Sequence, residues 1–258
     1  MINKIHHGDC LDLMTNIPDK SIDAIICDLP YGTTACKWDV VIPFVPLWKH
    51  YNRVIKGNGV IVLFGSEPFS SHLRLSNIKN YKYDWVWCKN TTSGGLLAKK
   101  QPLRNHENII VFYNKQCFYN PIKEPRDLNN ESKNRYKYSF NSEIDIRSNI
   151  HNNKIKRTKG GKKDLYCYPK TVKKFNTDHP NSLERVHPTQ KPVKLIEYLI
   201  KTYTNETETI LDNCIGSGTT AIACINTNRK YIGIEKDKGY FDIANERIKK
   251  HNEQTRMF

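Results

Sequence analysis

The chain has 258 residues and a hydrophobic content of 38%, which is enough for one α/β domain with an inserted or appended subdomain. Its 41 Lys and Arg residues outnumber 26 Asp and Glu residues. The net charge of +15 indicates an anionic partner, nucleic acid first and a membrane surface second. No apolar run approaches the length of about 18 residues that a transmembrane helix needs. A general excess of lysine in the source proteome is the alternative explanation of the charge.

Eight cysteines are spread along the chain, and no two of them have the C-x2-C spacing of a zinc site. They are Cys10, Cys27, Cys36, Cys88, Cys117, Cys167, Cys214 and Cys224. We therefore expect reduced, mostly buried thiols, no metal site and no signal peptide. Together these features favour a soluble protein of the cytoplasm.

Residues 1–114 carry apolar runs at the spacing of an α/β domain. Four runs are typical of strands that are buried on both faces of a sheet, at residues 22–26, 59–65, 83–89 and 107–114. Between the first two runs, residues 43–56 predict a helix despite their prolines. We take this part as one half of the main domain.

Residues 115–185 have a different texture, with 17 Lys and Arg residues against 8 acids and no clean helical or alternating period. Basic residues interleaved with aromatic ones suit phosphate contact and base stacking. We interpret this region as a basic insertion that contacts nucleic acid. A solvated linker is the alternative.

Regular patterning returns in residues 186–258. Residues 191–204 predict an amphipathic helix with Pro192 in its first turn. Residues 209–237 then predict a strand, a glycine turn, a helix and a second strand, and a last helix carries Tyr240, Ala244 and Ile248 on one face.

The glycine turn lies in the stretch LDNCIGSGTT. Gly216 and Gly218 allow a ligand to approach the backbone, and the next strand ends in Glu235, which could accept both ribose hydroxyls of a nucleoside cofactor. A plain tight turn is the alternative. Neither G-x-G-x-x-G nor G-K-[ST] is present, so a cofactor without a phosphate group, S-adenosylmethionine, fits best. Thr189 and Lys191 in HPTQKP are placed to hold its methionine carboxylate, with helix capping as the alternative.

A third motif, Asp-Leu-Pro-Tyr at 28–31, ends the first apolar run. With HPTQKP and LDNCIGSGTT following in this order, the chain resembles the DNA amino-methyltransferases that methylate adenine N6 or cytosine N4. The order of the motifs is similar to that of the β class. This resemblance implies a circularly permuted, Rossmann-like S-adenosylmethionine-dependent methyltransferase sheet. It divides the chain into a catalytic part (1–114), a target-recognition insertion (115–185) and a cofactor-binding part (186–258).

The resemblance also assigns residues to roles. Asp28, Pro30 and Tyr31 match the catalytic D-P-P-Y motif of the family. The positions that it implies for cofactor binding are Asp9, Cys10, Thr189, Lys191, Asp212, Gly216, Ser217, Gly218, Thr219 and Glu235. Two departures stand out: Leu29 replaces the first proline of D-P-P-Y, and Asn213-Cys214 replace the usual Pro-Phe, which puts cofactor affinity in question.

The chemistry explains the motif. An exocyclic amino group is a poor nucleophile because its lone pair is delocalised into the ring. Asp28 and the Leu29–Pro30 backbone can accept hydrogen bonds from this amino group and so favour a pyramidal nitrogen. The cofactor's methyl group is held in line with the nitrogen lone pair. The base must be flipped out of the duplex, and Tyr31 would stack on it.

An acid at position 28 resembles the adenine-N6 branch, whereas serine is commoner there in cytosine-N4 enzymes. We therefore expect a site-specific adenine-N6 methyltransferase acting on double-stranded DNA, from a restriction–modification system or an orphan relative. A cytosine-N4 enzyme, a catalytically silent nucleic-acid-binding subunit and an RNA methyltransferase are the alternatives. A homodimer and a cognate restriction endonuclease are further partners that the resemblance allows.

DNA contacts are expected in the basic insertion. Its phosphate-contacting side chains would be Lys154, Lys156, Arg157, Lys162 and Lys163. Binding of this kind would associate the protein with the nucleoid.

Overall fold

The computed structural model describes residues 1–34, 36, 39–126, 138–139, 158–159, 165–177 and 190–255. The chain divides into two compact units, one of Met1–Asn120 with Lys170–Phe258 and the other of Pro121–Pro169. The smaller unit therefore lies inside the range that we assigned to the basic insertion. No helix in the described ranges is both long and apolar enough to span a membrane.

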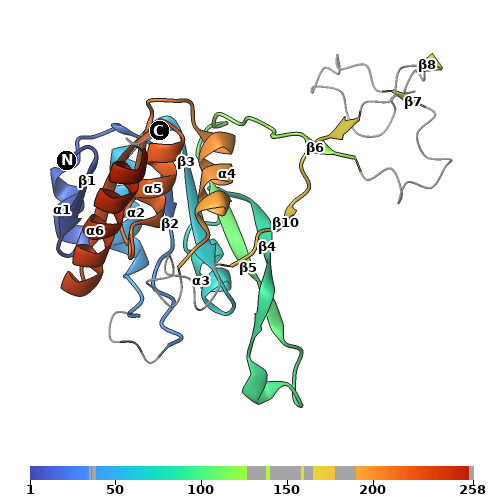
Figure 1. Cartoon of the computed structure of the whole chain (residues 1–258), viewed down its shortest axis with the longest axis horizontal. Helices are drawn as coiled ribbons and strands as arrows, with labels where there is room; N and C mark the ends of the chain where they lie inside the picture. The colour runs from blue at the N-terminus through green and yellow to red at the C-terminus, as the bar shows by residue number, and fades with distance from the viewer. Residues whose placement is uncertain are drawn as a thin grey trace. The chain divides into compact units, whose positions relative to one another are not determined.

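An eight-stranded sheet forms the centre of the larger unit, in the order β1–β12–β11–β2–β3–β5–β4–β10 (Figure 1). Its strands are β1 (Lys4–His7), β2 (Ile22–Cys27), β3 (Ile55–Gly65), β4 (Tyr81–Ser93), β5 (Arg104–Phe112), β10 (Val172–Lys174), β11 (Thr209–Asp212) and β12 (Lys230–Glu235). Only β5 runs antiparallel to its neighbours among these paired strands. The predicted Rossmann-like methyltransferase sheet is confirmed.

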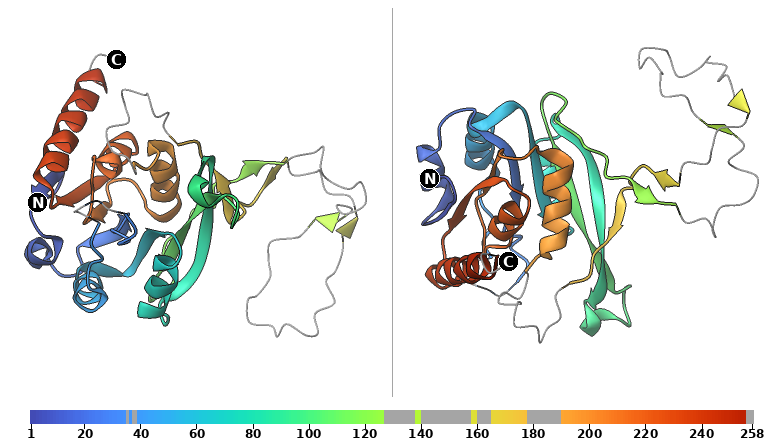
Figure 2. Two further views of the ribbon diagram at one scale, coloured as in Figure 1. Left: turned by 90° about the horizontal axis from the view of Figure 1, so that it is seen from below. Right: turned by 45° about the horizontal axis from the view of Figure 1, so that its top comes forward.

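In the described part of the chain, helices cover both faces of the sheet (Figure 2). On one face lie α4 (Val193–Tyr203), α5 (Thr219–Asn226) and α6 (Lys238–Thr255). On the other lie α1 (Cys10–Leu13), which continues into the short 3₁₀ helix η1 (Met14–Asn16), α2 (Phe44–Val54) and α3 (Phe69–Ser76). The two layers bury two hydrophobic cores.

Alternation along the central strands explains the two cores. In β2, Ala24 and Ile26 pack under α4, α5 and α6, whereas Ile25 and Cys27 pack under α1, α2 and α3. Successive side chains of a strand point to opposite faces, so a strand that is covered on both sides has a continuous apolar sequence. This is why the runs at 22–26, 59–65 and 107–114 predict strands correctly.

Strand β4 and strand β5 extend beyond the sheet as a hairpin, which is closed by the 3₁₀ helix η2 (Gly95–Leu97). Residues 90–106 of this hairpin are exposed. The bases of its two strands stay inside the sheet, where Trp87 is almost fully buried. The hairpin therefore connects an exposed tip to the part of β4 and β5 that borders the site described below.

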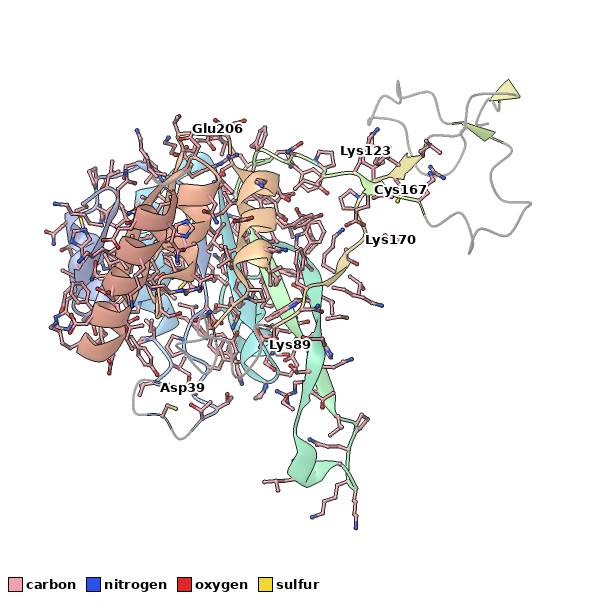
Figure 3. The ribbon with its side chains drawn as sticks, in the orientation of Figure 1. Asp39, Lys89, Lys123, Cys167, Lys170 and Glu206 are labelled. Carbon is pink, nitrogen blue, oxygen red and sulfur yellow. The ribbon has the colours of Figure 1, made fainter. Side chains whose placement is uncertain are left out.

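The smaller unit contains two short antiparallel strand pairs among its described residues. One pair joins β6 (Glu124–Pro125) and β9 (Tyr166–Cys167), and the other joins β7 (Tyr138–Ser139) and β8 (Thr158–Lys159). Lys123 stands just before β6 (Figure 3). Its ammonium group lies 5.5 Å from the ring centre of Tyr168. This contact fits a cation–π interaction next to the first pair.

Two details differ from the sequence expectations. Pro192 is the N-cap residue of α4 and not part of its first turn. Strand β10 lies within 115–185 but pairs in parallel with β4, so it belongs to the main sheet.

The cysteines are free thiols, of which four are buried, three are partly buried and Cys36 is exposed.

Candidate active site and family

Four carboxylates gather where neighbouring parallel strands end. Asp28 follows β2, Asp212 ends β11, Glu235 ends β12, and Asp9 comes two residues after β1. Ligands of open α/β sheets bind at the carboxyl ends of the strands. A cavity of about 500 Å³ lies at this edge, and all four acids line it.

Most of the residues assigned from the sequence line this same cavity. They are Asp9, Cys10, Asp28, Pro30, Tyr31, Lys191, Asp212, Gly216, Ser217, Thr219 and Glu235. Gly218 is not among the lining residues, because it packs against Ala244 of α6. Thr189 lies outside the described residues. The same holds for the basic positions Lys154, Lys156, Arg157, Lys162 and Lys163.

Both oxygens of Asp28 accept hydrogen bonds from side chains. The Tyr31 hydroxyl donates to Oδ1 at 2.6 Å, and the Lys191 ammonium donates to Oδ2 at 2.5 Å. The Tyr31 ring also stacks on Phe69, with ring centres 4.9 Å apart. These contacts fix the carboxyl of Asp28 at the edge of the cavity.

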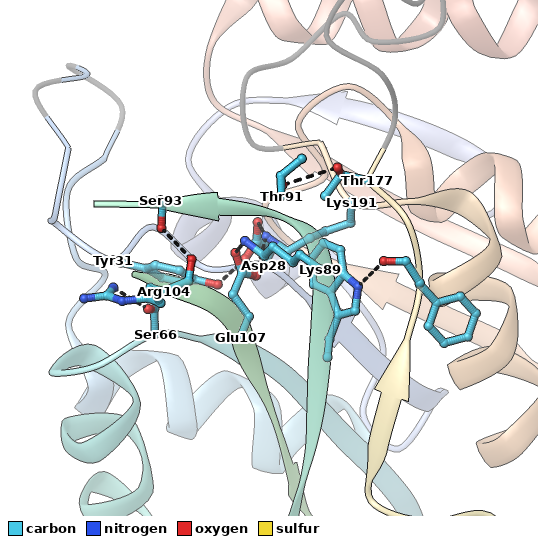
Figure 4. A network of polar contacts seen from close by, with 12 residues as sticks. Asp28, Tyr31, Ser66, Lys89, Thr91, Ser93, Arg104, Glu107, Thr177 and Lys191 are labelled. Carbon is cyan, nitrogen blue, oxygen red and sulfur yellow. Dashed lines mark hydrogen bonds and ion pairs between the residues drawn. The ribbon is translucent and has the colours of Figure 1, made fainter. Parts of the chain in front are cut away.

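Lys191 connects Asp28 to a second acid, Glu107 of β5 (Figure 4). Its ammonium lies 3.2 Å from Glu107 Oε2, and Lys89 of β4 donates to the other oxygen of Glu107. Two cations and two carboxylates thus alternate in the order Asp28, Lys191, Glu107 and Lys89. This arrangement balances their charges in a partly buried place.

Burial and charge oppose each other at this cluster. Burial raises the pKa of Asp28, the positive charge of Lys191 lowers it, and the negative charge of Glu107 raises it again. For Lys191, burial favours the neutral amine, but the two carboxylates raise its pKa above the ordinary value. Lys191 is therefore a stable cation beside Asp28.

Leu29, which interrupts the expected motif, is buried in the core under α2 and α3 with an exposure of 3%. Leu29 also lines the cavity, as do Asp28 and Tyr31 on either side of it in the chain. The acid and the tyrosine of the motif therefore both reach the cavity although leucine stands in place of proline.

The glycine loop is tied to Glu235. Its Oε2 accepts a hydrogen bond from the backbone N–H of Gly216 at 2.8 Å, and its Oε1 accepts one from Asp237. Gly216 has a φ of 53°, and no atom would meet an added Cβ there, so this backbone is open toward a ligand. Burial raises the pKa of Glu235.

Asp212 closes the other side of the loop. It accepts hydrogen bonds from the backbone N–H of Cys214 at 3.1 Å and from the Thr220 hydroxyl at 2.6 Å. Burial raises its pKa to about 6. Asn213, which stands in place of a proline, accepts a hydrogen bond from the buried Tyr51 hydroxyl at 2.5 Å. The Asn213 amide also donates to Cys214 Sγ at 3.5 Å, so the side chains of both departures in this motif take part in hydrogen bonds.

The loop after Tyr31 is held by Asp39 (Figure 3). The carboxylate accepts three backbone hydrogen bonds, from Gly32 at 2.8 Å, Thr33 at 2.9 Å and Thr34 at 2.7 Å. Asp39, Thr33 and Thr34 all line the cavity. Asp39 therefore shapes one wall of the site.

A family model described as DNA methylase matches residues 22–246, which is most of the chain. The chain belongs to the DNA methylase family. Its name covers N6 and N4 methyltransferases, so the family assignment agrees with the resemblance found in the sequence.

Curated relatives agree with this DNA methylase assignment. The chain is 26% identical to the type II methyltransferase M.BglII of Bacillus subtilis, over 94% of this chain and 68% of the relative. It is 26% identical to M1.MboII of Moraxella bovis, with 95% of both chains covered. It is 27% identical to the DNA adenine methyltransferase YhdJ of Escherichia coli, over 95% of this chain and 82% of the relative.

Solved structures share the fold of this DNA methylase. A complex of M1.HpyAVI with SAM matches with a TM-score of 0.61 and 24% identity, over 95% of this chain and 98% of the other. The cytosine-N4-specific PvuII DNA methyltransferase matches with a TM-score of 0.64 and 15% identity, over 94% and 85%. At these identities the likeness concerns the fold.

Several polar residues of this candidate site could not be assigned from the sequence, among them Asp39, Lys89 and Glu107. Glu107 opens an ordinary apolar run, and Lys89 closes another, so neither has a local signal. Their meeting depends on the antiparallel pairing of β4 and β5, in which Trp87 lies opposite Glu107. Asp39 had a weak signal, an acid shortly after a turn sequence that begins with Gly32.

Proposed function

We propose that this chain is an S-adenosylmethionine-dependent methyltransferase that transfers a methyl group to adenine N6 in double-stranded DNA. The observation that carries the proposal is the carboxyl of Asp28, which is held at the rim of the cavity by Tyr31 and Lys191. A positioned hydrogen-bond acceptor is what an exocyclic amino group needs to become a nucleophile.

The cavity fits the proposed cofactor. Its volume of about 500 Å³ is in the range of small-molecule sites. Glu235 lies where an acid can accept ribose hydroxyls, and the open backbone at Gly216 lies beside it. Asp9 is exposed enough to accept a hydrogen bond from an adenine amino group. The hydrogen bond from Lys236 lowers the pKa of Asp9. The bound cofactor would supply an electrophilic methyl group.

The residues of this chain would then position the target base. Asp28 accepts a hydrogen bond from the amino group, and the backbone carbonyls of Leu29 and Pro30 provide a second acceptor. Charge builds up on the amino nitrogen during transfer, and the nearby carboxylate stabilises it. The base reaches the site only after flipping out of the duplex. Tyr31, which stacks on Phe69, would offer its ring to the flipped base.

Adenine is favoured over cytosine by the acid at position 28. Cytosine N4 is the second candidate, because the fold is also shared with the cytosine-N4-specific PvuII enzyme. We also propose 115–185 as the region that reads the target sequence, between the catalytic part (1–114) and the cofactor part (186–258). Its charge supports this role, since the region contains 17 basic and 8 acidic residues.

The test is incubation of the purified chain with tritiated S-adenosylmethionine and either duplex DNA or RNA in parallel, followed by digestion to nucleosides. Label in N6-methyl-2′-deoxyadenosine supports the proposal. Label in N4-methyl-2′-deoxycytidine alone would show that the methylated base is cytosine, the second candidate. Label in RNA but not in DNA, or no label in either, would contradict the DNA methyltransferase function.

A further inference from the structure

An ion pair of the buried Lys191 and the mostly buried Glu107 adjoins the carboxyl of Asp28. Lys191 has a side-chain exposure of 8%, and Glu107 one of 13%. Neither residue belongs to the Asp-Leu-Pro-Tyr motif at 28–31. Burying charged groups is costly, so a cluster of this kind calls for a functional explanation or a strong structural one.

The geometry joins the pair to Asp28 through one group. The Lys191 ammonium reaches Asp28 Oδ2 at 2.5 Å and Glu107 Oε2 at 3.2 Å, so it bridges the two acids. It also lies 5.2 Å from the ring centre of Phe64 and 5.9 Å from that of Tyr31. The ammonium is thus confined by two carboxylates and two aromatic rings.

Glu107 in turn has a fixed place. Lys89 donates to its Oε1, while its Oε2 is buried and faces Lys191 without a hydrogen bond of good geometry. The ammonium of Lys89 also lies 5.0 Å from the ring centre of Trp87. Glu107 therefore sits between two cations, and only one of them contacts Asp28.

We propose that Lys191 and Glu107 are positioning residues that together set the orientation and the charge of Asp28. Lys191 holds Oδ2 and stabilises the carboxylate, and Glu107 limits that stabilisation by sharing the ammonium. This inference rests on the proposed function. It gives Lys191 a task different from the contact with the methionine carboxylate that the sequence predicted.

The proposal predicts opposite effects for the two residues. Lys191 contributes a positive charge, which favours ionised Asp28, and Glu107 contributes a negative charge, which disfavours it. Transfer requires Asp28 to accept a hydrogen bond, so the rate falls as the pH falls through its pKa. Removing Lys191 should move this acid limb to higher pH, and removing the charge of Glu107 should move it to lower pH.

Other groups near Asp28 belong to several elements and must be kept constant. The charged or titratable groups that act on it or are acted on by it are Tyr31, Cys27, Lys191, Glu107 and Asp212. Burial raises the pKa of Cys27 to about 12, so its thiol stays neutral through the range to be measured. Asp212 has a pKa of about 6. Any change of rate caused by its titration is common to the wild type and both variants.

The experiment compares Lys191→Met and Glu107→Gln with the wild type in single-turnover methyl transfer to duplex DNA, from pH 5 to pH 9. Affinity for S-adenosylmethionine is measured by calorimetry on the same samples. For Lys191→Met we expect about a 100-fold slower transfer at pH 7, the scale of loss for a misplaced reacting group. We also expect an acid limb at higher pH and cofactor affinity close to that of the wild type.

For Glu107→Gln we expect transfer to persist with an acid limb at lower pH than in the wild type. Matched controls are Lys250→Met and Glu246→Gln, which remove the partners of an exposed ion pair on α6. Their profiles should overlay that of the wild type. Circular dichroism and the calorimetric titration verify that each variant is folded.

Four outcomes decide the proposal. Opposite shifts of the acid limb support it. Shifts in the same direction, or no shift with Lys191→Met, would overturn it. Loss of cofactor affinity with Lys191→Met and an unchanged Glu107→Gln profile would instead assign Lys191 to the methionine end. A wild-type chain that methylates no DNA contradicts the proposed function itself, which separates that failure from failure of this inference.

Discussion

At the scale of single residues, the acids of the cavity differ in the groups that donate hydrogen bonds to them. Asp212 and Glu235 accept hydrogen bonds from backbone amides of the glycine loop, which holds that loop in shape. Within the described part of the chain, Asp28 accepts hydrogen bonds from two side chains, a hydroxyl and an ammonium, and it lines the cavity. We therefore expect replacement of Asp28 to affect methyl transfer and replacement of Asp212 to affect stability.

Asp28→Asn keeps the shape of the side chain but removes its charge. We expect methyl transfer to fall about 100-fold or more, the usual contribution of a positioned acid or base. Cofactor affinity should change little, because Asp28 is not tied to the glycine loop. Transfer is measured with labelled S-adenosylmethionine and affinity by calorimetry, with Asp19→Asn, an exposed acid, as the control. Full activity of Asp28→Asn would refute the role of this residue.

Asp212 should make stability depend on pH. Its pKa is raised by burial from 3.8 to about 6, so the folded state favours the protonated acid. The stability that this preference adds is complete only well below the unfolded pKa of 3.8 and is lost as the pH rises through 6. Relative to Asp212→Asn, the wild type should lose about 2 kcal/mol of unfolding free energy between pH 4 and pH 7. Urea unfolding at both pH values measures it, and a constant difference would contradict it.

At the scale of elements, the loop after β2 depends on Asp39, because one carboxylate holds three successive amides. We expect Asp39→Ala to slow methyl transfer about 10- to 100-fold, since the loop forms a wall of the cavity and small displacements there are costly. Asp39→Asn, which keeps one acceptor oxygen, should lose less. Asp242→Ala, on the exposed surface of α6, is the control. Unchanged kinetics of Asp39→Ala would show that the loop is held by other contacts.

Elements with a strong local signal could be predicted from the sequence. The run at 22–26, the glycine turn at Gly216 and the acid Glu235 each stand at the end of a strand or next to one, so their meeting at one edge of the sheet could be predicted. Glu107 and Lys89 could not be found this way, because their contact with Lys191 depends on the antiparallel pairing of β5 and on the approach of a distant segment. Long-range pairing of this kind leaves no periodic trace in the sequence.

At the scale of the whole molecule, the basic charge is concentrated in the region 115–185, where we place target recognition. Replacing Lys154, Lys156, Arg157, Lys162 and Lys163 together with alanine should weaken DNA binding and flatten its dependence on salt concentration. Each lost phosphate contact reduces the slope of log K against log salt by about 0.9. Fluorescence anisotropy at several salt concentrations measures the slope. An unchanged slope would assign the phosphate contacts to another surface.

Methylation-aware sequencing of DNA from cells that express this chain is the most direct test of methyl transfer to adenine N6, with cells expressing Asp28→Asn as the control. We expect N6-methyladenine at one short recurring sequence, present with the wild type and absent with the variant. N4-methylcytosine in its place, or the same methylation pattern in both cultures, would contradict it.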